Sequence, residues 1–335
     1  MFNKYTFKGN YFELGQQTGV IFKDAINSNI DKYIKLLGNN IVRDRLDKTI
    51  EMISEKLPNC YEELLGKVKG SEVDIKPLVL MHCPEILDKV DGCTTAIYKK
   101  NDRILFSHNE DDKGYDHSNT ALVKYINEDG SWIVSLAGYD KLIGSCFGYN
   151  SKGLVFSCNF IYHEEVNLDL LSRYVVIRDV IESSNIDECK DKLTKYPTAS
   201  PFSFNVLEKD TLKVINIEND FENHYETIIN DRYPRSNHFL CKDNAKMSIS
   251  SKNRNINAKD RISKLNDDCS IYDLIDVLSL QNDDPNDCIL KDPNIFKDPK
   301  VALTICNFSY DSKQDLIIIN DYIDHTKLVM NYNEF

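Results

Sequence analysis

DGCTTAIYKKNDRILFS, residues 91–107, marks the point at which the character of the sequence changes. Before it, apolar residues recur at steps of three and four, and after it, β-branched and aromatic runs alternate with short polar segments. Within the stretch, residues 100–102 (Lys-Asn-Asp) separate the runs Thr94–Tyr98 and Arg103–Ser107, which predicts a β-hairpin. Cys93 therefore stands where a region of expected helices gives way to a region of expected strands.

The first 90 residues are expected to be helical. One helix is predicted by apolar residues at steps of four and three, namely Phe22, Ile26, Ile30, Tyr33 and Leu37. We expect Gly38 to cap this helix, and two further helices to cover about 41–56 and 60–69.

The remainder of the chain is expected to pair strands locally. Turn-forming segments separate pairs of apolar runs, which predicts hairpins joining 121–126 to 131–137, 144–149 to 154–159, 202–207 to 211–217 and 301–308 to 315–319. Helical patterns are predicted over 170–181, 186–196, 257–265 and 271–280, and segment 282–300 is predicted to be a surface loop. Strands, then helices, then strands again predict an α+β layered fold.

Composition narrows the possible partners. The chain has 335 residues, 41% of them apolar, and a formal net charge of −12. An acidic surface repels phosphate, so nucleic acid is not an expected partner. Because no run of 18 apolar residues is present, no membrane span is expected, and the first eight residues lack the apolar run of a signal peptide. We therefore expect a cytoplasmic protein.

The ten cysteines do not form a C-x-x-C pair, which argues against a zinc ribbon or a dithiol redox motif. Most are expected to be reduced core thiols. His163-Glu164-Glu165 has no partner histidine at helical spacing, so no metal site is predicted.

Gly92 and Cys93 suit a self-cleaving bond. Glycine tolerates strained backbone angles and lets a side chain approach its carbonyl group. A thiol that attacks the Gly92 carbonyl carbon would form a thioester, and water would then release Cys93 as a new N-terminus. Its α-amine, with an ordinary pKa of about 8, can serve as general base for its own thiol. The structural alternative is a core cysteine at the start of a strand.

Residues 91–96 (Asp-Gly-Cys-Thr-Thr-Ala) resemble the processing site of the isopenicillin N acyltransferase (acyl-CoA:6-aminopenicillanic acid acyltransferase) family. These are N-terminal-nucleophile (Ntn) hydrolases related to the choloylglycine hydrolases. Other segments match family patterns in the same order, namely Gly9–Gly15 with Gly19, His108–Asp111, Gly148–Phe160 and Ser236–Phe239. The resemblance implies a four-layer αββα sandwich with two antiparallel sheets.

The resemblance also implies roles for single residues. Asp111 would hold the α-amine of Cys93 and tune its protonation. Asn159 and Asn237 would lie near the scissile carbonyl group, where a neutral amide donor stabilises an oxyanion by roughly 3 kcal/mol.

Four further positions are expected near the site on weaker grounds. His108 and Asn109 precede the acidic residues of the matched segment, and His238 follows the second asparagine. His108 occupies the position of an arginine in choloylglycine hydrolases, which argues against a bile salt hydrolase in the strict sense. Arg254 is a looser match to a family arginine that precedes a helix.

The expected product of cleavage is a helical fragment 1–92 and a catalytic fragment 93–335, which remain associated in one compact domain. The expected reaction is transfer of an acyl group from a linear amide or thioester through a thioester on Cys93. The acceptor is water in an amidase or an amine in an acyltransferase, and the sequence leaves this open, as it leaves the oligomeric state. No cofactor is implied, although acyl-CoA is a candidate substrate.

Two other readings remain open. One is an uncleaved thiol hydrolase in which His238 or His108 assists Cys93. The other is a non-catalytic binding relative of the family.

Overall fold

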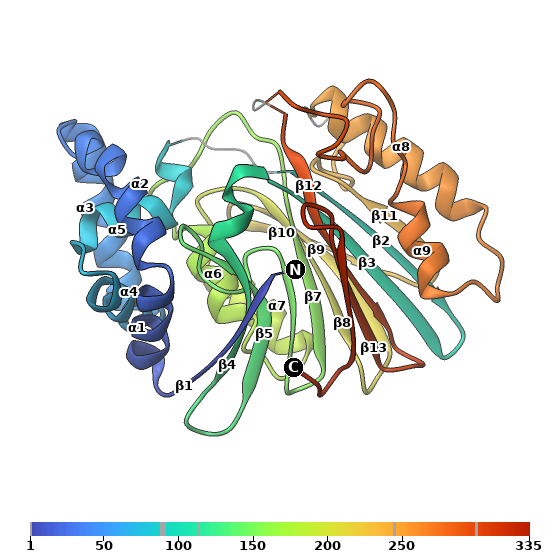
Figure 1. The fold of residues 1–335 in the computed structure, drawn as a ribbon, viewed down its shortest axis with the longest axis horizontal. Coiled ribbons are helices and arrows are strands. Elements are labelled where there is room, and N and C mark those ends of the chain that lie inside the picture. Colours follow the sequence, from blue (N-terminus) through green and yellow to red (C-terminus); the bar gives the residue numbers. More distant parts are fainter. Residues whose placement is uncertain (1, 88–91, 113, 244–245, 299–300) are drawn as a thin grey trace.

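The computed structural model describes residues 2–87, 92–112, 114–243, 246–298 and 301–335. Its strands form two sheets, with helices on both outer sides (Figure 1). The eight-stranded sheet has the order β1-β4-β5-β6-β7-β8-β9-β10 and the six-stranded sheet the order β11-β2-β3-β12-β13-β14. The bounds in the first sheet are β1 Asn3–Lys8, β4 Thr120–Ile126, β5 Trp132–Gly138, β6 Phe147–Asn150, β7 Leu154–Phe160, β8 Phe202–Glu208, β9 Lys213–Asp220 and β10 Asn223–Ile228. Those in the second are β11 Arg232–Arg235, β2 Gly92–Lys100, β3 Arg103–Asp112, β12 Leu303–Asp311, β13 Leu316–Asp321 and β14 Thr326–Asn331.

The helices form the two outer layers. Over the eight-stranded sheet lie α1 Tyr11–Ile21, α2 Lys23–Leu36, α3 Asn40–Lys56, α4 Pro58–Ser71, α5 Ile75–His82, α6 Arg173–Val180 and α7 Ile186–Lys195. Over the six-stranded sheet lie α8 Ile249–Ser263 and α9 Ile271–Val277. Two 3-10 helices, Pro84–Leu87 and Gly114–Asn119, precede strands. None of the described helices is long and apolar enough to cross a membrane.

Among the described residues, three separate apolar cores hold the four layers together. The first joins α1–α7 to the eight-stranded sheet, and includes Leu14, Leu64 and Ile177. The second fills the space between the sheets, with Phe106, Phe147 and Phe308 among its members. The third joins the six-stranded sheet to α8 and α9. The expected four-layer αββα arrangement is therefore confirmed.

The hairpins expected from turn chemistry all form, since β2–β3, β4–β5, β6–β7, β8–β9 and β12–β13 pair antiparallel. The pair β1–β4 is an exception to the expected antiparallel sheets, because these two strands run parallel. Strands β1, β10, β11 and β14 were not expected, and β14 means that β12–β13 is not the last hairpin.

Two local expectations were wrong. Gly38 does not take the left-handed conformation of a C-cap, and Leu37 occupies the C-cap of α2 in a right-handed conformation. Segment 282–300 is not simply a surface loop, because Cys288 to Lys291 are buried within its described part. Ile289 belongs to the third core, and the neighbouring Lys291 reaches Asp111, the cross-strand partner of Gly92 at the start of β2.

The glycines of the N-terminal segment allow α1 and α4 to touch. A Cβ atom at Gly15 would lie 1.9 Å from the carbonyl oxygen of Glu63, and one at Gly66 would lie 1.9 Å from that of Phe12. No larger residue fits at either place without moving a helix. This contact fixes α4, and with it the buried residues that α4 presents to the eight-stranded sheet.

Candidate active site

Cys93 is the second residue of β2, in the six-stranded sheet. Across the hairpin, Cys93 pairs with Glu110 and Gly92 pairs with Asp111. Successive side chains of a strand point to opposite faces. The Cys93 side chain therefore enters the space between the sheets, where its Sγ lies 3.5 Å from the carbonyl oxygen of Cys158 on β7.

Asn237 contacts Cys93 at two atoms. The Cys93 N–H donates to Asn237 Oδ1 at 3.1 Å, and Asn237 Nδ2 donates to Cys93 Sγ at 3.3 Å. The same Nδ2 donates to the Phe160 carbonyl oxygen at 2.8 Å. Asn237, which was expected near the scissile carbonyl group, thus lies beside the backbone nitrogen and the sulfur of Cys93.

Arg254, the loosest of the sequence matches, also reaches this point. From α8, its Nη1 donates to the Cys93 carbonyl oxygen at 2.6 Å and to Thr94 Oγ1 at 2.7 Å. Its Nη2 donates to Asn237 Oδ1 at 2.7 Å. The guanidinium thus fixes both the backbone of Cys93 and the orientation of the Asn237 amide, because the oxygen of that amide must face the two donors.

Asp111 lies on the other face of β3, next to the Gly92 backbone. A Cβ atom at Gly92 would lie only 3.3 Å from Asp111 Oδ2. The carboxylate accepts from Lys291 Nζ at 2.8 Å and from Thr304 Oγ1 at 2.7 Å. Burial alone would raise the pKa of Asp111, but Lys291 and Arg254 outweigh it and hold that pKa below its ordinary value. Asp111 is therefore a carboxylate at neutral pH.

Asn159 lies on β7 with its amide between the sheets. Its Oδ1 accepts from Thr95 Oγ1 at 2.8 Å and from Asn205 Nδ2 at 2.9 Å. Its Nδ2 is buried and has no hydrogen-bond partner in the part of the chain that the structure describes. Leaving a buried donor unpaired costs about 1–3 kcal/mol, so this Nδ2 is a destabilising group in the interior.

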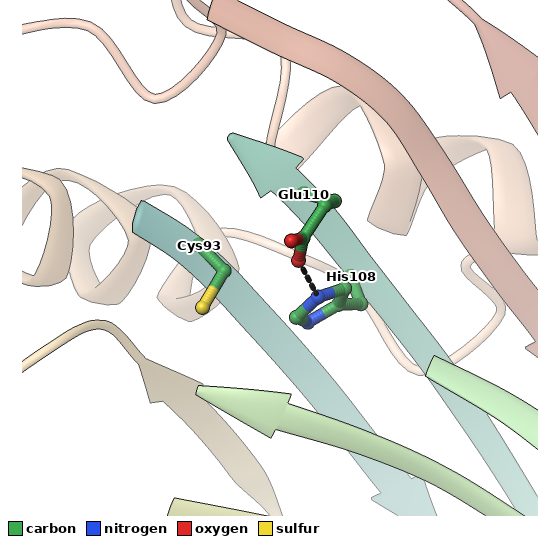
Figure 2. Close-up of side chains that lie close together, drawn as sticks. All are labelled: Cys93, His108 and Glu110. Atoms are coloured by element: carbon green, nitrogen blue, oxygen red, sulfur yellow. Dashed lines mark hydrogen bonds and ion pairs between the residues drawn. The ribbon is translucent and has the colours of Figure 1, made fainter. Parts of the chain in front are cut away.

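His108 and Glu110 share the interior face of β3 with Cys93 on β2 (Figure 2). His108 Nε2 lies 3.2 Å from Glu110 Oε2, and His108 Nδ1 lies 2.8 Å from Thr95 Oγ1. One donor atom from each of Cys93, His108 and Glu110 lies within 4.8 Å of the other two. Sequence inspection did not suggest this group, because its members are spread over two strands. Thiolate, imidazole and carboxylate are all ligands of Zn²⁺.

The surroundings keep the Cys93 thiol protonated in the intact chain. Burial, reinforced by the Glu110 carboxyl group, raises the pKa of Cys93 above its ordinary value. Burial also raises the pKa of Glu110, although His108 and Lys141 oppose this. Cys93 therefore needs a base to act as a nucleophile, since the thiolate is the reactive form.

Two expected site residues point elsewhere. Asn109 donates from Nδ2 to the Leu278 carbonyl oxygen at 2.9 Å, towards α9 and away from the space that holds the Cys93 side chain. His238 Nδ1 lies 2.8 Å from Ser251 Oγ and 3.2 Å from Ser236 Oγ. These contacts connect the segment after β11 to α8. His238 therefore helps to hold the neighbouring Asn237 in place.

The stability of the protein should depend on His238 in weakly acidic solution. Burial, together with Arg235 and Arg254, lowers the pKa of His238 from 6.5 to about 4. Between these values the unfolded chain binds a proton that the folded chain does not, so stability is lost as pH falls from 6.5 towards 4. We expect urea midpoints at pH of about 7, 5.5 and 4.5 to fall more steeply for the wild type than for His238→Gln. Parallel profiles would contradict this assignment.

Glu110, Lys291 and Thr304 were missed by sequence reasoning as site residues. Glu110 carried a signal, because it is the cross-strand partner expected for Cys93 once the hairpin register is set. Lys291 and Thr304 carried no such signal, because no local pattern relates them to Asp111, which lies 180 and 193 residues earlier.

Comparison with solved structures gives two distant likenesses. A variant of the conjugated bile acid hydrolase from Clostridium perfringens has 15% sequence identity and a TM-score of 0.48, over 72% of this chain and 92% of that one. Penicillin V acylase from Agrobacterium tumefaciens has 12% identity and a TM-score of 0.47, over 72% of this chain and 87% of that one.

Two curated relatives are similar in sequence. A β-alanyl-dopamine/carcinine hydrolase of Drosophila melanogaster is 25% identical over 243 residues, which cover 63% of each chain. The 40 kDa form of an acyl-coenzyme A:6-aminopenicillanic-acid acyltransferase of Emericella nidulans is 23% identical over 199 residues, covering 56% of this chain and 55% of that protein. The chain thus spans less than two thirds of either relative.

A sequence model of a family matches most of the chain. The match covers residues 97–318 and begins just after Cys93. Because it spans more than half of the 335 residues, the chain belongs to the acyl-coenzyme A:6-aminopenicillanic acid acyltransferase family.

Proposed function

We propose that this chain is an autoprocessing cysteine Ntn hydrolase, which cleaves or transfers the acyl group of a linear amide or acyl thioester through a thioester on Cys93. The observation that carries the proposal is the double contact of Asn237 with the N–H and the sulfur of Cys93. A core cysteine has no need of an amide that bonds both its backbone nitrogen and its thiol. Arg254, which holds Asn237 Oδ1 and the Cys93 carbonyl oxygen, makes the arrangement rigid.

In the first step, Cys93 Sγ attacks the Gly92 carbonyl carbon. The C–S bond forms, the C–N bond between Gly92 and Cys93 breaks, and the thiol proton passes to the departing nitrogen. Water then hydrolyses the thioester, which restores the thiol and leaves a carboxylate on Gly92. The proposed products are fragments 1–92 and 93–335, which stay associated because α1–α5 cover the eight-stranded sheet.

In the second step, the new α-amine of Cys93 acts as the base for its own thiol. Its nitrogen is the atom that contacts Asn237 Oδ1 in the intact chain, so this oxygen can accept from the amine and orient its lone pair. Asp111, beside Gly92 and ionised, supplies the negative charge that stabilises an ammonium form at that place. We propose that Asn159 Nδ2 and Asn237 Nδ2 donate to the oxyanion of the substrate.

The relatives indicate the class of substrate. One is named as a hydrolase of β-alanyl-dopamine and carcinine and the other as an acyltransferase that uses acyl-coenzyme A. We propose a small N-acyl amide or an acyl-coenzyme A as substrate, with water or an amine as acceptor. Screening should therefore begin with N-acyl amides of small amines.

Intact mass tests the proposal directly. The 38.6 kDa chain should give two fragments of roughly 11 and 28 kDa, by proportion of chain length, with the larger one beginning at Cys93. An activated acyl ester should then add the mass of its acyl group to the larger fragment alone. A chain that stays whole and takes up no acyl group would overturn the proposal.

Removal of the Asn159 amide should slow the chemical step. We expect Asn159→Ala to lower kcat about 100- to 1,000-fold with a small change in KM, because the unpaired Nδ2 acts only when an oxyanion forms. Steady-state kinetics with any hydrolysed amide measure both constants. Asn307→Ser is the matched control, since Asn307 is an equally buried amide that contacts Ser107 and Asn109. An equal loss of kcat in both variants would point to a general loss of structure instead.

One observation favours a second candidate, the uncleaved Cys/His thiol hydrolase. His108 lies within 4.8 Å of the sulfur, whereas the contacts of His238 lead away from it. Against this, both ring nitrogens of His108 already have partners, Thr95 and Glu110. Such an enzyme would be active as a single 38.6 kDa chain and would lose activity in His108→Gln.

A further inference from the structure

We propose that Cys93, His108 and Glu110 form an inhibitory site for a zinc ion, which occupies the sulfur of Cys93 and holds it inactive. The three side chains come from the paired strands β2 and β3, and all point into the space between the sheets (Figure 2). They are buried, with exposed fractions of 2%, 0% and 5%. The paired strands thus place three different donor atoms within 4.8 Å of one another.

The spacing suits a tetrahedral ion after a small movement. One donor atom of each residue lies within 4.8 Å of the other two. Around zinc, with bonds of about 2.0–2.3 Å, such atoms lie roughly 3.3–3.8 Å apart. Closure by about 1 Å is within reach of side-chain torsions, and no strand has to move.

The hydrogen bonds around His108 place its free lone pair on Nε2, the ring nitrogen that faces Glu110. Thr95 Oγ1 donates its only proton to Asn159 Oδ1, which also accepts from Asn205 Nδ2. His108 Nδ1 therefore carries a proton and donates to Thr95 Oγ1. The neutral ring then has its lone pair on Nε2, the atom that faces Glu110 Oε2 at 3.2 Å. A metal ion between these two atoms would meet this lone pair and an oxygen of the carboxyl group.

The charges of the three side chains also favour a divalent cation at this place. Binding would release the proton of the Cys93 thiol. A thiolate and a carboxylate then balance a divalent cation, and the imidazole is neutral, so the buried complex has no net charge. Burying either anion alone is costly, whereas a neutral complex avoids most of this penalty.

The fourth position needs a neutral donor. In a cleaved chain, the α-amine of Cys93 meets this need, because its nitrogen and its sulfur close a five-membered ring around one ion. This detail rests on the proposed function, whereas the three side-chain ligands do not. In either form, an ion bound to Sγ removes the lone pair that attacks the carbonyl carbon.

Cobalt(II) is the probe, because its thiolate complexes absorb in the near ultraviolet. The full chain carrying Cys241→Ala, which removes an exposed thiol, is first freed of metal with a chelator. Titration should then produce this absorption with one equivalent of Co²⁺, and Zn²⁺ should remove it. Cys93→Ser should abolish the absorption, and Glu110→Gln should weaken Co²⁺ binding at least 10- to 100-fold.

A second group of possible ligands provides the control. His117, Asp321 and Asp324 also lie within 4.8 Å of one another, but they include no thiol and cannot give this absorption. Asp324→Asn should leave the titration unchanged. No absorption in the parent chain, or the same absorption in Cys93→Ser, would overturn the zinc site. Failure of the metal-free chain to cleave itself would count against the Ntn proposal alone, because the three side-chain ligands need no cleaved bond.

Discussion

Cys93→Ala should remain a single chain of 38.6 kDa under conditions in which the wild type gives two fragments. The variant has no sulfur to attack the Gly92 carbonyl carbon, and after any other cleavage it would have no nucleophile for substrate. We therefore expect turnover to fall roughly 10,000-fold or more, as it does when an enzyme loses the atom that forms its covalent intermediate. Intact mass and a steady-state assay on the same preparation measure the two losses.

Cys158→Ala is the matched control for this prediction. Cys158 is also buried, and its backbone carbonyl oxygen is the acceptor for Cys93 Sγ, but its own side chain lies in the core beneath the helices. This variant should cleave itself and turn over substrate like the wild type. Fragments that begin at residue 93 in the Cys93→Ala preparation would refute self-cleavage by this thiol and indicate a separate protease.

The fold was predictable where pairing is local. The five hairpins β2–β3, β4–β5, β6–β7, β8–β9 and β12–β13 all close over short polar turns between apolar runs, and such turns are visible in sequence. The missed strands lack that signal. β10 has no buried side chain, and β1 joins β4 in parallel across more than 110 residues. Sequence periodicity carries no information about such a distant partner.

The residues of the site also divide into those that local sequence patterns indicate and those that they do not. Cys93, Asp111, Asn159 and Asn237 stand out in sequence because they lie in short segments with a recognisable order, and the structure gathers them around the start of β2. Lys291 reaches Asp111 from a segment expected to be a surface loop, so its charge could not be placed. Arg254 was only loosely matched, yet it makes three hydrogen bonds in the site. Long side chains that cross between layers depend on packing that no local pattern encodes.

A buried ion pair joins the two proposed fragments. Arg178 on α6 donates from Nε to Glu63 Oε2 on α4 at 2.6 Å, and both residues are about 1% exposed. Arg178 Nη1 also donates to Glu182 Oε1 at 2.8 Å, and the Tyr125 hydroxyl donates to Glu63 Oε1 at 3.3 Å. Glu63 belongs to segment 1–92 and its partners to segment 93–335. Arg178 therefore loses the closer of its two carboxylate partners when the N-terminal helices leave, and keeps only Glu182.

Glu63→Gln should consequently destabilise the protein by about 3–5 kcal/mol, because it leaves the buried guanidinium without its closest counter-charge. Urea unfolding in the uncleaved Cys93→Ala background measures this loss without interference from fragment separation. Glu164→Gln is the control, since the Glu164–Lys246 pair is exposed and such pairs contribute less than about 1 kcal/mol. The double variant Glu63→Met/Arg178→Met should regain most of the loss, because it removes both charges from the apolar interface. In the cleaved protein, Glu63→Gln should also let the two fragments separate at lower urea concentration than in the wild type. Equal stability of Glu63→Gln and Glu164→Gln would show that the N-terminal helices are held by apolar packing alone.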